Sequence, residues 1–266
     1  MSGEKRFSGR VALVTGAAGN IGLATARRLA EDGADIVLLD IAADKLAEAK
    51  DAVATFGTRV ETATCDVTDF ASVDAAVARA EELLGPVALL FNNAGYQGAF
   101  TPIQDYSPED FAKVIQIDLI GAFHVLRAVS ARMVAHGFGR IVNTASMAGL
   151  QGPPNMGAYA AAKFGIVGLT QTASKDLAPH NIRVNGIAPA LMGPGFMWDR
   201  QVELQAKAGT QYFSSDPEEV SKAMIGSVPM RRLGDISEIP GVVSFLMGED
   251  SSYMTGVTLP ISGGIL

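Results

Sequence analysis

The chain has 266 residues, of which 48% are hydrophobic and 18% charged, and its formal net charge is −7. This length and composition are typical of one globular domain with a sizeable core. The acidic balance argues against nucleic acid or an anionic membrane as a partner, because both would repel the protein. The one cysteine, Cys65, excludes an intramolecular disulfide and favours a reducing cytoplasm. The N-terminus has no apolar signal region, and no window approaches the roughly 18 apolar residues of a membrane span.

The first predicted elements in chain order are a strand, a glycine-rich turn and a helix. The apolar run from Val11 to Val14 predicts a buried strand, and the next residues are Thr15-Gly16-Ala-Ala-Gly19-Asn20-Ile21-Gly22. Helical spacing of apolar side chains then continues as far as Leu29. Glycines let the backbone approach a pyrophosphate, and the free N–H groups of a helix N-terminus attract its charge. The sequence therefore predicts a dinucleotide site, with a tight turn that binds no ligand as the alternative.

The second predicted strand, 34–39, ends at Asp40. A carboxylate at this position can accept hydrogen bonds from both ribose hydroxyls of an adenosine, and it would repel a 2′-phosphate. The flanking Ala17, Ala18 and Ile41 supply no cation that would offset this repulsion. The sequence therefore predicts a preference for NAD over NADP.

Strand-like and helix-like segments then alternate along the chain. The further predicted strands are 59–64, 87–91, 140–144 and 182–187, and the predicted helices are 45–56, 70–84, 108–136 and 157–177. Uniformly apolar strands of this kind suit a parallel sheet that is covered on both faces. We therefore expect an α/β fold, in which residues 1–266 form a single Rossmann-type domain with a doubly wound parallel sheet.

Residues 191–227 interrupt this alternation. They follow the predicted strand 182–187 and contain Phe196-Met197-Trp198 before two amphipathic stretches. Because α/β folds place ligands at the carboxyl ends of their strands, we expect this segment to be a helical lid over the substrate. The alternative is that the three apolar side chains form a packing patch or a subunit contact.

Ser146, Tyr159 and Lys163 are the candidate catalytic residues. Ser146 follows the strand 140–144, and Tyr159 lies four residues before Lys163 on nearly the same face of a predicted helix. The lysine ammonium would lower the pKa of the tyrosine phenol, which is about 10 when unperturbed. Such a tyrosine can accept the proton of a hydroxyl group.

Together these motifs resemble the classical short-chain dehydrogenase/reductase family over essentially the whole chain. The matching residues are the glycine turn, Asp40, Asp66-Val67, Asn92-Asn93-Ala94-Gly95, Ser146, Tyr159, Lys163, Arg183-Val-Asn185 and Thr255-Gly256. The resemblance implies that Tyr159 is the general base, that Ser146 holds the reacting oxygen and that Lys163 binds the nicotinamide ribose. The implied cofactor is NAD, whose nicotinamide would accept a hydride.

The resemblance also implies which residues surround the ligands. The implied cofactor-binding residues are Gly16, Gly19, Asn20, Ile21, Gly22, Asp40, Ile41, Asp66, Val67, Asn93, Ala94, Gly95, Tyr159, Lys163, Pro189 and Met192. The implied substrate-binding residues are Ser146, Gln97, Asn155, Met192, Phe196 and Trp198. No metal is expected, because the three histidines are scattered without ligand spacing.

Three positions depart from the family pattern. Glycine at 19 and asparagine at 20 stand where the family commonly has the glycine one residue later, and asparagine tolerates the left-handed conformations of a tight turn. Ala190 stands where glycine is common. Asp118 replaces the asparagine that completes the usual catalytic tetrad, and we count it as a catalytic residue that still supports a proton relay.

Stretches 91–100, 152–156, 192–198 and 201–207 resemble bacterial NAD-dependent polyol dehydrogenases in particular. The implied reaction interconverts a polyol and its keto sugar, with xylitol and D-xylulose as the expected pair. The alternatives are a 3-oxoacyl-[acyl-carrier-protein] reductase, another secondary-alcohol dehydrogenase, and a dinucleotide-sensing scaffold without catalysis. The family also implies a homotetramer, paired through the helix 108–136 and the helix that carries Tyr159.

Overall fold

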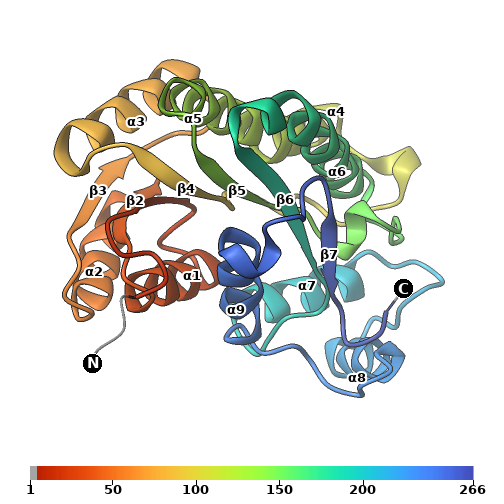
Figure 1. The fold of residues 1–266 in the computed structure, drawn as a ribbon. Coiled ribbons are helices and arrows are strands. Elements are labelled where there is room, and N and C mark those ends of the chain that lie inside the picture. The colour runs from red at the N-terminus through yellow and green to blue at the C-terminus, as the bar shows by residue number, and fades with distance from the viewer. Residues whose placement is uncertain (1–4, 266) are drawn as a thin grey trace.

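One parallel sheet organises the chain. The computed structural model describes residues 5–265, and within them seven strands pair in the order β3-β2-β1-β4-β5-β6-β7. The strands are β1 (Val11–Thr15), β2 (Asp35–Asp40), β3 (Val60–Thr64), β4 (Val87–Asn92), β5 (Gly139–Thr144), β6 (Ile182–Pro189) and β7 (Thr258–Ile261). The chain passes from the edge strand β3 back to β4, so the strand order reverses between β1 and β4 (Figure 1). Ligands of α/β folds bind at the carboxyl ends of the strands beside such a reversal.

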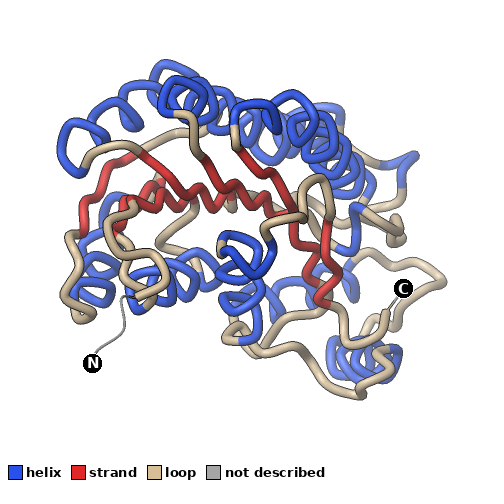
Figure 2. Tube along the Cα trace, viewed as in Figure 1, coloured by secondary structure: helices blue, strands red, loops and turns tan. Residues whose placement is uncertain are grey.

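Helices cover both faces of the sheet (Figure 2). One face carries α1 (Asn20–Glu31), α2 (Ala43–Ala54) and α9 (Glu238–Met247), and the other carries α3 (Phe70–Leu84), α4 (Pro108–Ile115), α5 (Ala122–His136) and α6 (Gly157–Leu177). In β1, Val14 packs in the core under α1 and α9, whereas Leu13 packs in the core under α3 and α5. Because consecutive strand residues point to opposite faces, both cores require apolar side chains. The predicted doubly wound α/β fold is confirmed.

The predicted helix 108–136 is continuous, but its winding changes in the middle. Between α4 and α5 the chain forms a π-helical turn, η2 (Gln116–Gly121). Such turns are rare and often occur at functional sites. This one carries Asp118, whose side chain is fully buried. A regular helical pattern of apolar residues does not reveal such a turn, and the sequence analysis did not predict it.

The same segment, Pro108–His136, is long and apolar enough by composition to cross a membrane, with a mean hydropathy of 1.4. The sequence analysis expected no segment of this kind. In the fold α5 packs on β4 and on α3, and 44% of the apolar window is buried inside the domain. The core helix of a globular domain has this same composition, which accounts for the hydropathy.

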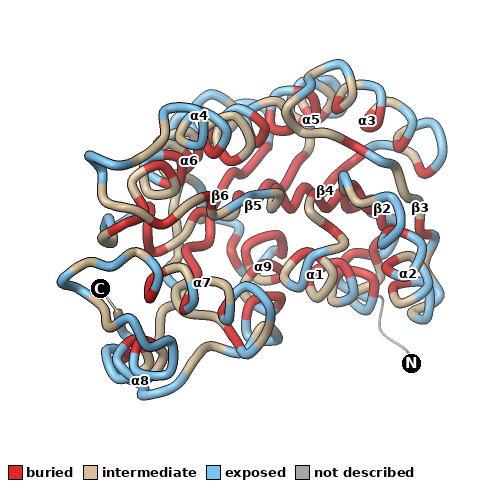
Figure 3. The backbone as a smooth tube through the Cα atoms, turned by 180° about the vertical axis from the view of Figure 1, so that it is seen from behind, coloured by how far each residue is buried: buried red, intermediate tan, exposed pale blue. Residues whose placement is uncertain are grey.

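Two helices form a small layer beyond the carboxyl end of β6: α7 (Phe196–Lys207) and α8 (Pro217–Ser227) (Figure 1). They share an apolar cluster that includes Trp198 and Val220. The inner strands of the sheet are buried, whereas much of α8 is exposed (Figure 3). Residues 191–227 therefore contain the two helices expected of a lid. The shorter helical turns are η1 (Ile103–Asp105), η3 (Met147–Gly149), η4 (Ala178–His180) and η5 (Glu249–Ser251).

Candidate active site

A cavity of about 1140 Å³ opens at the carboxyl ends of β1, β4, β5 and β6. Its walls are the loops that follow these strands, together with residues of η2, α6 and α7. A single small-molecule pocket usually has a volume of roughly 300–1,000 Å³, so this cavity has room for a dinucleotide and a substrate together. The strand-order reversal between β1 and β4 lies at its floor.

The glycine-rich turn after β1 is closely packed. Gly16 has φ +62°, and a Cβ on it would approach the Cα of Ala94 to 3.0 Å. A Cβ on Gly22 would lie 2.1 Å from the carbonyl oxygen of Gly16, so only glycine lets α1 begin directly against the turn. Among the described residues no side chain caps the N-terminus of α1, where Gly19 is the cap residue. Its free N–H groups are therefore available to an anion such as a pyrophosphate.

Asp40 is fixed at the end of β2 by two backbone N–H groups. Its Oδ2 accepts a hydrogen bond of 2.9 Å from the N–H of Ala18, and its Oδ1 accepts one of 2.9 Å from the N–H of Ala42. Each carboxylate oxygen has a second lone pair, and these can accept hydrogen bonds from ribose hydroxyls. The neighbouring Ile41 is exposed and uncharged.

Thr15 holds the loop after β4 against the glycine turn. Its Oγ1 accepts hydrogen bonds from the N–H of Asn93 at 2.8 Å and of Ala94 at 3.1 Å. The Asn93 side chain donates back to the Thr15 carbonyl at 3.2 Å and accepts from the Thr144 hydroxyl at 3.3 Å. These bonds connect the ends of β1, β4 and β5 and hold the floor of the cavity together.

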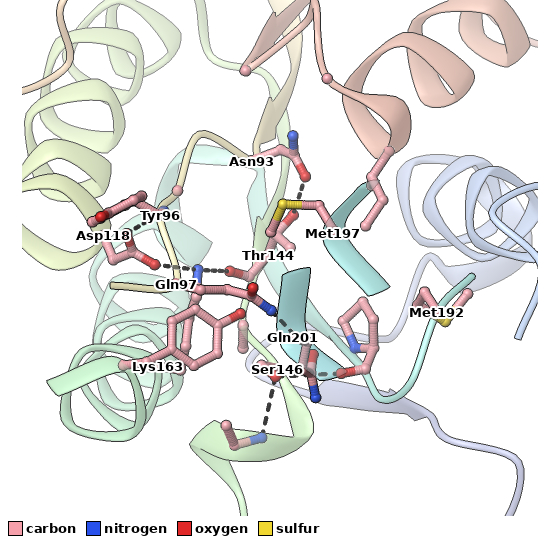
Figure 4. A pocket seen from close by; sticks show the side chains of 18 of the residues that line it. Asn93, Tyr96, Gln97, Asp118, Thr144, Ser146, Lys163, Met192, Met197 and Gln201 are labelled. Carbon is pink, nitrogen blue, oxygen red and sulfur yellow. Dashed lines mark hydrogen bonds and ion pairs between the residues drawn. The ribbon is translucent and has the colours of Figure 1, made fainter. Parts of the chain in front are cut away.

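Ser146, Tyr159 and Lys163 meet in the cavity, as Figure 4 shows for Ser146 and Lys163. The Ser146 hydroxyl donates to the Pro189 carbonyl at 3.4 Å and accepts from the N–H of Ala148 at 3.2 Å. Lys163 Nζ donates to the Thr144 carbonyl at 3.1 Å and lies 5.4 Å from the centre of the Tyr159 ring. A hydroxyl donor, a phenol and a buried ammonium therefore converge on one region.

Opposing effects act on the phenol of Tyr159. Burial raises the pKa of Tyr159, and the Lys163 ammonium and the Ser146 hydroxyl, which lower it, offset only part of that increase. The charge of Asp118 raises the same pKa further. The net effect raises the pKa of Tyr159 and so favours the protonated phenol. Lys163 acts in the direction that the sequence analysis expected, but burial outweighs it.

Asp118 pairs with Lys163 inside the protein. Its Oδ2 lies 3.2 Å from Lys163 Nζ, and its Oδ1 accepts a hydrogen bond of 2.6 Å from the N–H of Tyr96. Burial raises the pKa of Asp118, and the ammonium and the Tyr96 amide oppose this increase. Burial lowers the pKa of Lys163, but Asp118 and Tyr159 raise it further than burial lowers it. Gly95 lies against the pair, since a Cβ there would be 3.1 Å from Asp118 Oδ2.

The structure brings most of the expected ligand-binding residues to this cavity. All of the expected cofactor-binding residues line it except Gly22, which packs beneath the turn. Of the expected substrate-binding residues, Phe196 and Asn155 are not in the lining. Phe196 is 73% exposed, because the first turn of α7 points it to solvent. Asn155 is buried, and its side chain donates to Gln205 Oε1 at 2.9 Å and to Thr210 Oγ1 at 3.2 Å, so it is bonded to α7 and to the segment after it.

Several residues of the cavity were not predicted. Thr15 and Thr144 hold its floor, and Met197, Gln201 and Gln205 of α7 line its wall. Gln201 and Gln205 are four residues apart, so they lie on the same face of the helix. This spacing was available in the sequence, but a polar pair on a helix usually indicates a solvent-facing side.

Residues 5–265 contain no group of three or more His, Cys, Asp and Glu side chains that could hold a metal ion. Burial raises the pKa of the Cys65 thiol. Cys65 is therefore a core thiol with little thiolate character. Ser146, Tyr159, Lys163 and Asp118 are the expected catalytic residues, and all four line the cavity.

The fold and the site define a dinucleotide-dependent oxidoreductase, and the comparison with known proteins gives its family. The short chain dehydrogenase family matches residues 10–204, so the chain belongs to this family. An NAD⁺-bound xylitol dehydrogenase of known crystal structure is 61% identical in sequence to this chain, and the two structures superpose with a TM-score of 0.97. The match covers 98% of this chain and 100% of the xylitol dehydrogenase. Levodione reductase from Leifsonia aquatica is 38% identical over 261 residues, which are 97% of this chain and 95% of that protein. Carveol dehydrogenase from Mycobacterium avium, solved with NAD, is 32% identical with a TM-score of 0.88, and each chain is 98% covered. The named substrates of these relatives differ widely.

Proposed function

We propose that the protein is an NAD-dependent polyol dehydrogenase that interconverts xylitol and D-xylulose. One observation carries this proposal: Ser146, Tyr159 and Lys163 line the same cavity as Gln201 and Gln205, two side-chain amides of α7. Side-chain amides in such a wall suit a substrate with several hydroxyl groups. The 61% identity to a xylitol dehydrogenase supports the same substrate.

The residues of the cofactor half fit NAD. The free N–H groups of α1 suit the pyrophosphate, and Asp40 suits an adenosine ribose with two free hydroxyls. A 2′-phosphate would meet the Asp40 carboxylate, and the adjacent Ile41 offers no charge to balance it. When bound, NAD supplies the acceptor for the hydride that leaves the carbinol carbon.

The protein's own side chains then handle the proton. Ser146 would exchange its bond to the Pro189 carbonyl for one to the substrate oxygen and orient that oxygen. Tyr159 would accept the hydroxyl proton during oxidation and return it during reduction. Lys163 would stabilise the phenolate by its charge while it also binds the nicotinamide ribose.

Asp118 would connect Lys163 to the rest of the proton path. A carboxylate has nearly the shape of the asparagine amide but has no N–H donors. Its Oδ2 faces Lys163 Nζ at 3.2 Å, so it can accept a proton or hold a water molecule beside the ammonium. We therefore expect a working relay with a pH dependence of its own.

NAD reduction by the purified enzyme tests this function. The substrates are xylitol, other polyols, monohydroxy secondary alcohols and cyclic alcohols, each at saturating NAD. We expect the highest kcat/KM with xylitol. A preference for a 3-oxoacyl thioester with NADPH would instead indicate an acyl-carrier-protein reductase. NAD binding without turnover of any alcohol would indicate a dinucleotide-sensing scaffold.

We also propose a cytoplasmic homotetramer. The exposed side chains of α5 and α6 include Phe123, which is 44% exposed, and Phe164, which is 47% exposed. Large apolar side chains on adjacent helices are typical of an interface. Sedimentation equilibrium at micromolar concentration tests the assembly, and a monomer would contradict it.

A further inference from the structure

Gln97 and Gln201 join the two sides of the substrate region. Gln97 follows β4, Gln201 lies on α7, and Nε2 of Gln97 donates to Oε1 of Gln201 at 3.1 Å (Figure 4). Beside them, Arg200 Nη2 donates to the Gly98 carbonyl at 3.1 Å. Both glutamines line the cavity, together with Ser146 and Tyr159. The pair therefore connects α7 to the loop after β4 and at the same time lines the cavity.

The single bond leaves part of each amide free. Oε1 of Gln97 is buried and has no hydrogen-bond partner among the described residues. A buried carbonyl oxygen without a partner is costly and is normally satisfied by water or a ligand. Nε2 of Gln201 donates to no other residue in the described part of the chain, so its N–H groups are free as well. The bonded pair therefore has one acceptor and one donor group without a partner among the described residues.

The presence of one free acceptor and one free donor group does not depend on how the two amides are oriented. If both amide groups are rotated by 180°, the bond between them persists, and one oxygen and one NH₂ group again remain free. A hydroxyl group both donates and accepts, so a single hydroxyl can bond to the free oxygen and the free NH₂ group together. A hydrocarbon segment at the same place would leave both amides without partners.

The surroundings of the pair favour a neutral ligand. Arg200 is engaged with Gly98 and lies 5.6 Å from the centre of the Tyr96 ring. Lys113 Nζ lies 5.3 Å from the centre of the same ring. Among the residues that line this part of the cavity, Met192, Met197 and Trp198 have no charge. Both of these cations lie over the Tyr96 ring, and neither forms a hydrogen bond with the glutamine pair.

We propose that Gln97 and Gln201 together bind a substrate hydroxyl other than the reacting one and so select polyols over monohydroxy secondary alcohols. This inference rests on the proposed polyol dehydrogenase function. It adds Gln201 to the substrate-binding residues and gives the lid a direct part in specificity. A bound polyol would bridge the lid and the loop, whereas a monohydroxy alcohol would leave them joined by the amide bond alone.

Three variants test the proposal: Gln97→Met, Gln201→Met and Gln201→Glu. Methionine keeps the side-chain length and removes both polar groups, whereas Gln201→Glu keeps the acceptor for Gln97 and removes the N–H groups. We expect each variant to lower kcat/KM for xylitol about tenfold and to leave kcat/KM for 2-butanol nearly unchanged. The double methionine variant should lose little more than either single one, because the two side chains act on one hydroxyl. Gln104→Met is the control, since Gln104 is exposed outside the cavity.

The outcomes separate this inference from the function on which it rests. If the wild-type enzyme prefers 2-butanol to xylitol, the proposed function fails, and the inference fails with it. If the wild type prefers xylitol and the variants keep the same ratio of the two kcat/KM values, only the inference is overturned. If the variants lose kcat/KM equally with both substrates, the glutamine pair only holds α7 in place. This result would also overturn the proposal that the pair selects polyols.

Discussion

The two halves of the cavity are built differently. The cofactor half is formed by the ends of buried strands, joined by bonds such as those from Thr15 to Asn93 and Ala94. The substrate half includes α7, which has its own small apolar cluster and reaches the rest of the domain through side chains such as Gln201 and Arg200. A site on connected strands is formed in advance, whereas a site on a separately packed helix can change without disturbing the sheet. This difference agrees with the existence of relatives that share the fold but are named for different substrates.

The largest expected effect comes from Tyr159→Phe, which removes the proton acceptor. General acid–base groups contribute about 10²–10⁴-fold to rate, so we expect kcat to fall by this factor. The Kd for NADH should be nearly unchanged, because the substitution removes only the hydroxyl group and keeps the ring that lines the cavity. Steady-state kinetics and NADH fluorescence measure the two quantities. Near-normal turnover would remove Tyr159 from the mechanism.

Trp198→Ala should disturb only the substrate half. Trp198 is 7% exposed in the cluster between α7 and α8, and truncating a buried tryptophan costs about 3–5 kcal/mol. We expect a higher KM for the polyol and faster hydrogen exchange confined to the lid, with the Kd for NADH nearly unchanged. Tyr212→Ala is the control, because Tyr212 is 61% exposed. Loss of NADH binding in Trp198→Ala would mean that the two halves are not independent.

The double substitution Asp40→Ser and Ile41→Arg should disturb only the cofactor half. Removing the carboxylate and adding a guanidinium replaces repulsion of a 2′-phosphate by attraction. We expect the ratio of kcat/KM for NAD to that for NADP to fall about 10- to 100-fold, equivalent to about 1.4–2.8 kcal/mol. The KM for the polyol should not change. Comparable use of both cofactors by the wild type would contradict the role of Asp40.

The smallest expected effect is that of Asp118→Asn. The charge of Asp118 raises the pKa of Tyr159, so removing that charge should lower it. Because the phenolate is the base in oxidation, the acid limb of the kcat/KM profile should move to lower pH. The maximal rate should stay within about tenfold, a barrier change of about 1.4 kcal/mol. A pH–rate profile measured in the direction of oxidation tests the shift.

Asp118→Leu is the matching control for the relay. Leucine removes the partner of Lys163 and cannot hold a water molecule beside the ammonium. We expect a loss well beyond that of Asp118→Asn. An Asp118→Leu enzyme with unchanged kcat and pH profile would show that the relay does not pass through this position.

Local sequence patterns predicted the elements whose composition is constrained by burial or by a tight turn. The apolar run Val11–Val14 and the glycines after it indicated β1 and its turn, because a strand buried on both faces has few other compositions. The edge strand β7 and the helix α9 were not predicted. β7 is short and only partly buried, with Pro260 among its residues, and helix α9 has Pro240 in its first turn. Such elements are defined by what they pack against, and their own sequences carry little signal.

In the site, too, the sequence predicted the residues that stand in motifs but not the contacts made by α7. Tyr159, Lys163 and Asp40 stand in motifs whose chemistry constrains their positions. In the lid, the sequence indicated apolar residues, but the phase of α7 decides that Met197 lines the cavity and that Phe196 faces solvent. The roles of Gln97 and Gln201 depend on contacts between segments about a hundred residues apart in the chain, which no local pattern contains.

The position of β1 at the interior of the sheet has a consequence for synthesis on the ribosome. Its first partner, β2, follows after one helix, but its second partner, β4, begins only at Val87. Until then one edge of an apolar strand has unpaired N–H and C=O groups, which is a template for association with another chain. Parallel pairing across long connections is also slow. Nascent chains released before Asn92 are therefore expected to aggregate, and chaperones that bind short apolar segments would be needed during this interval.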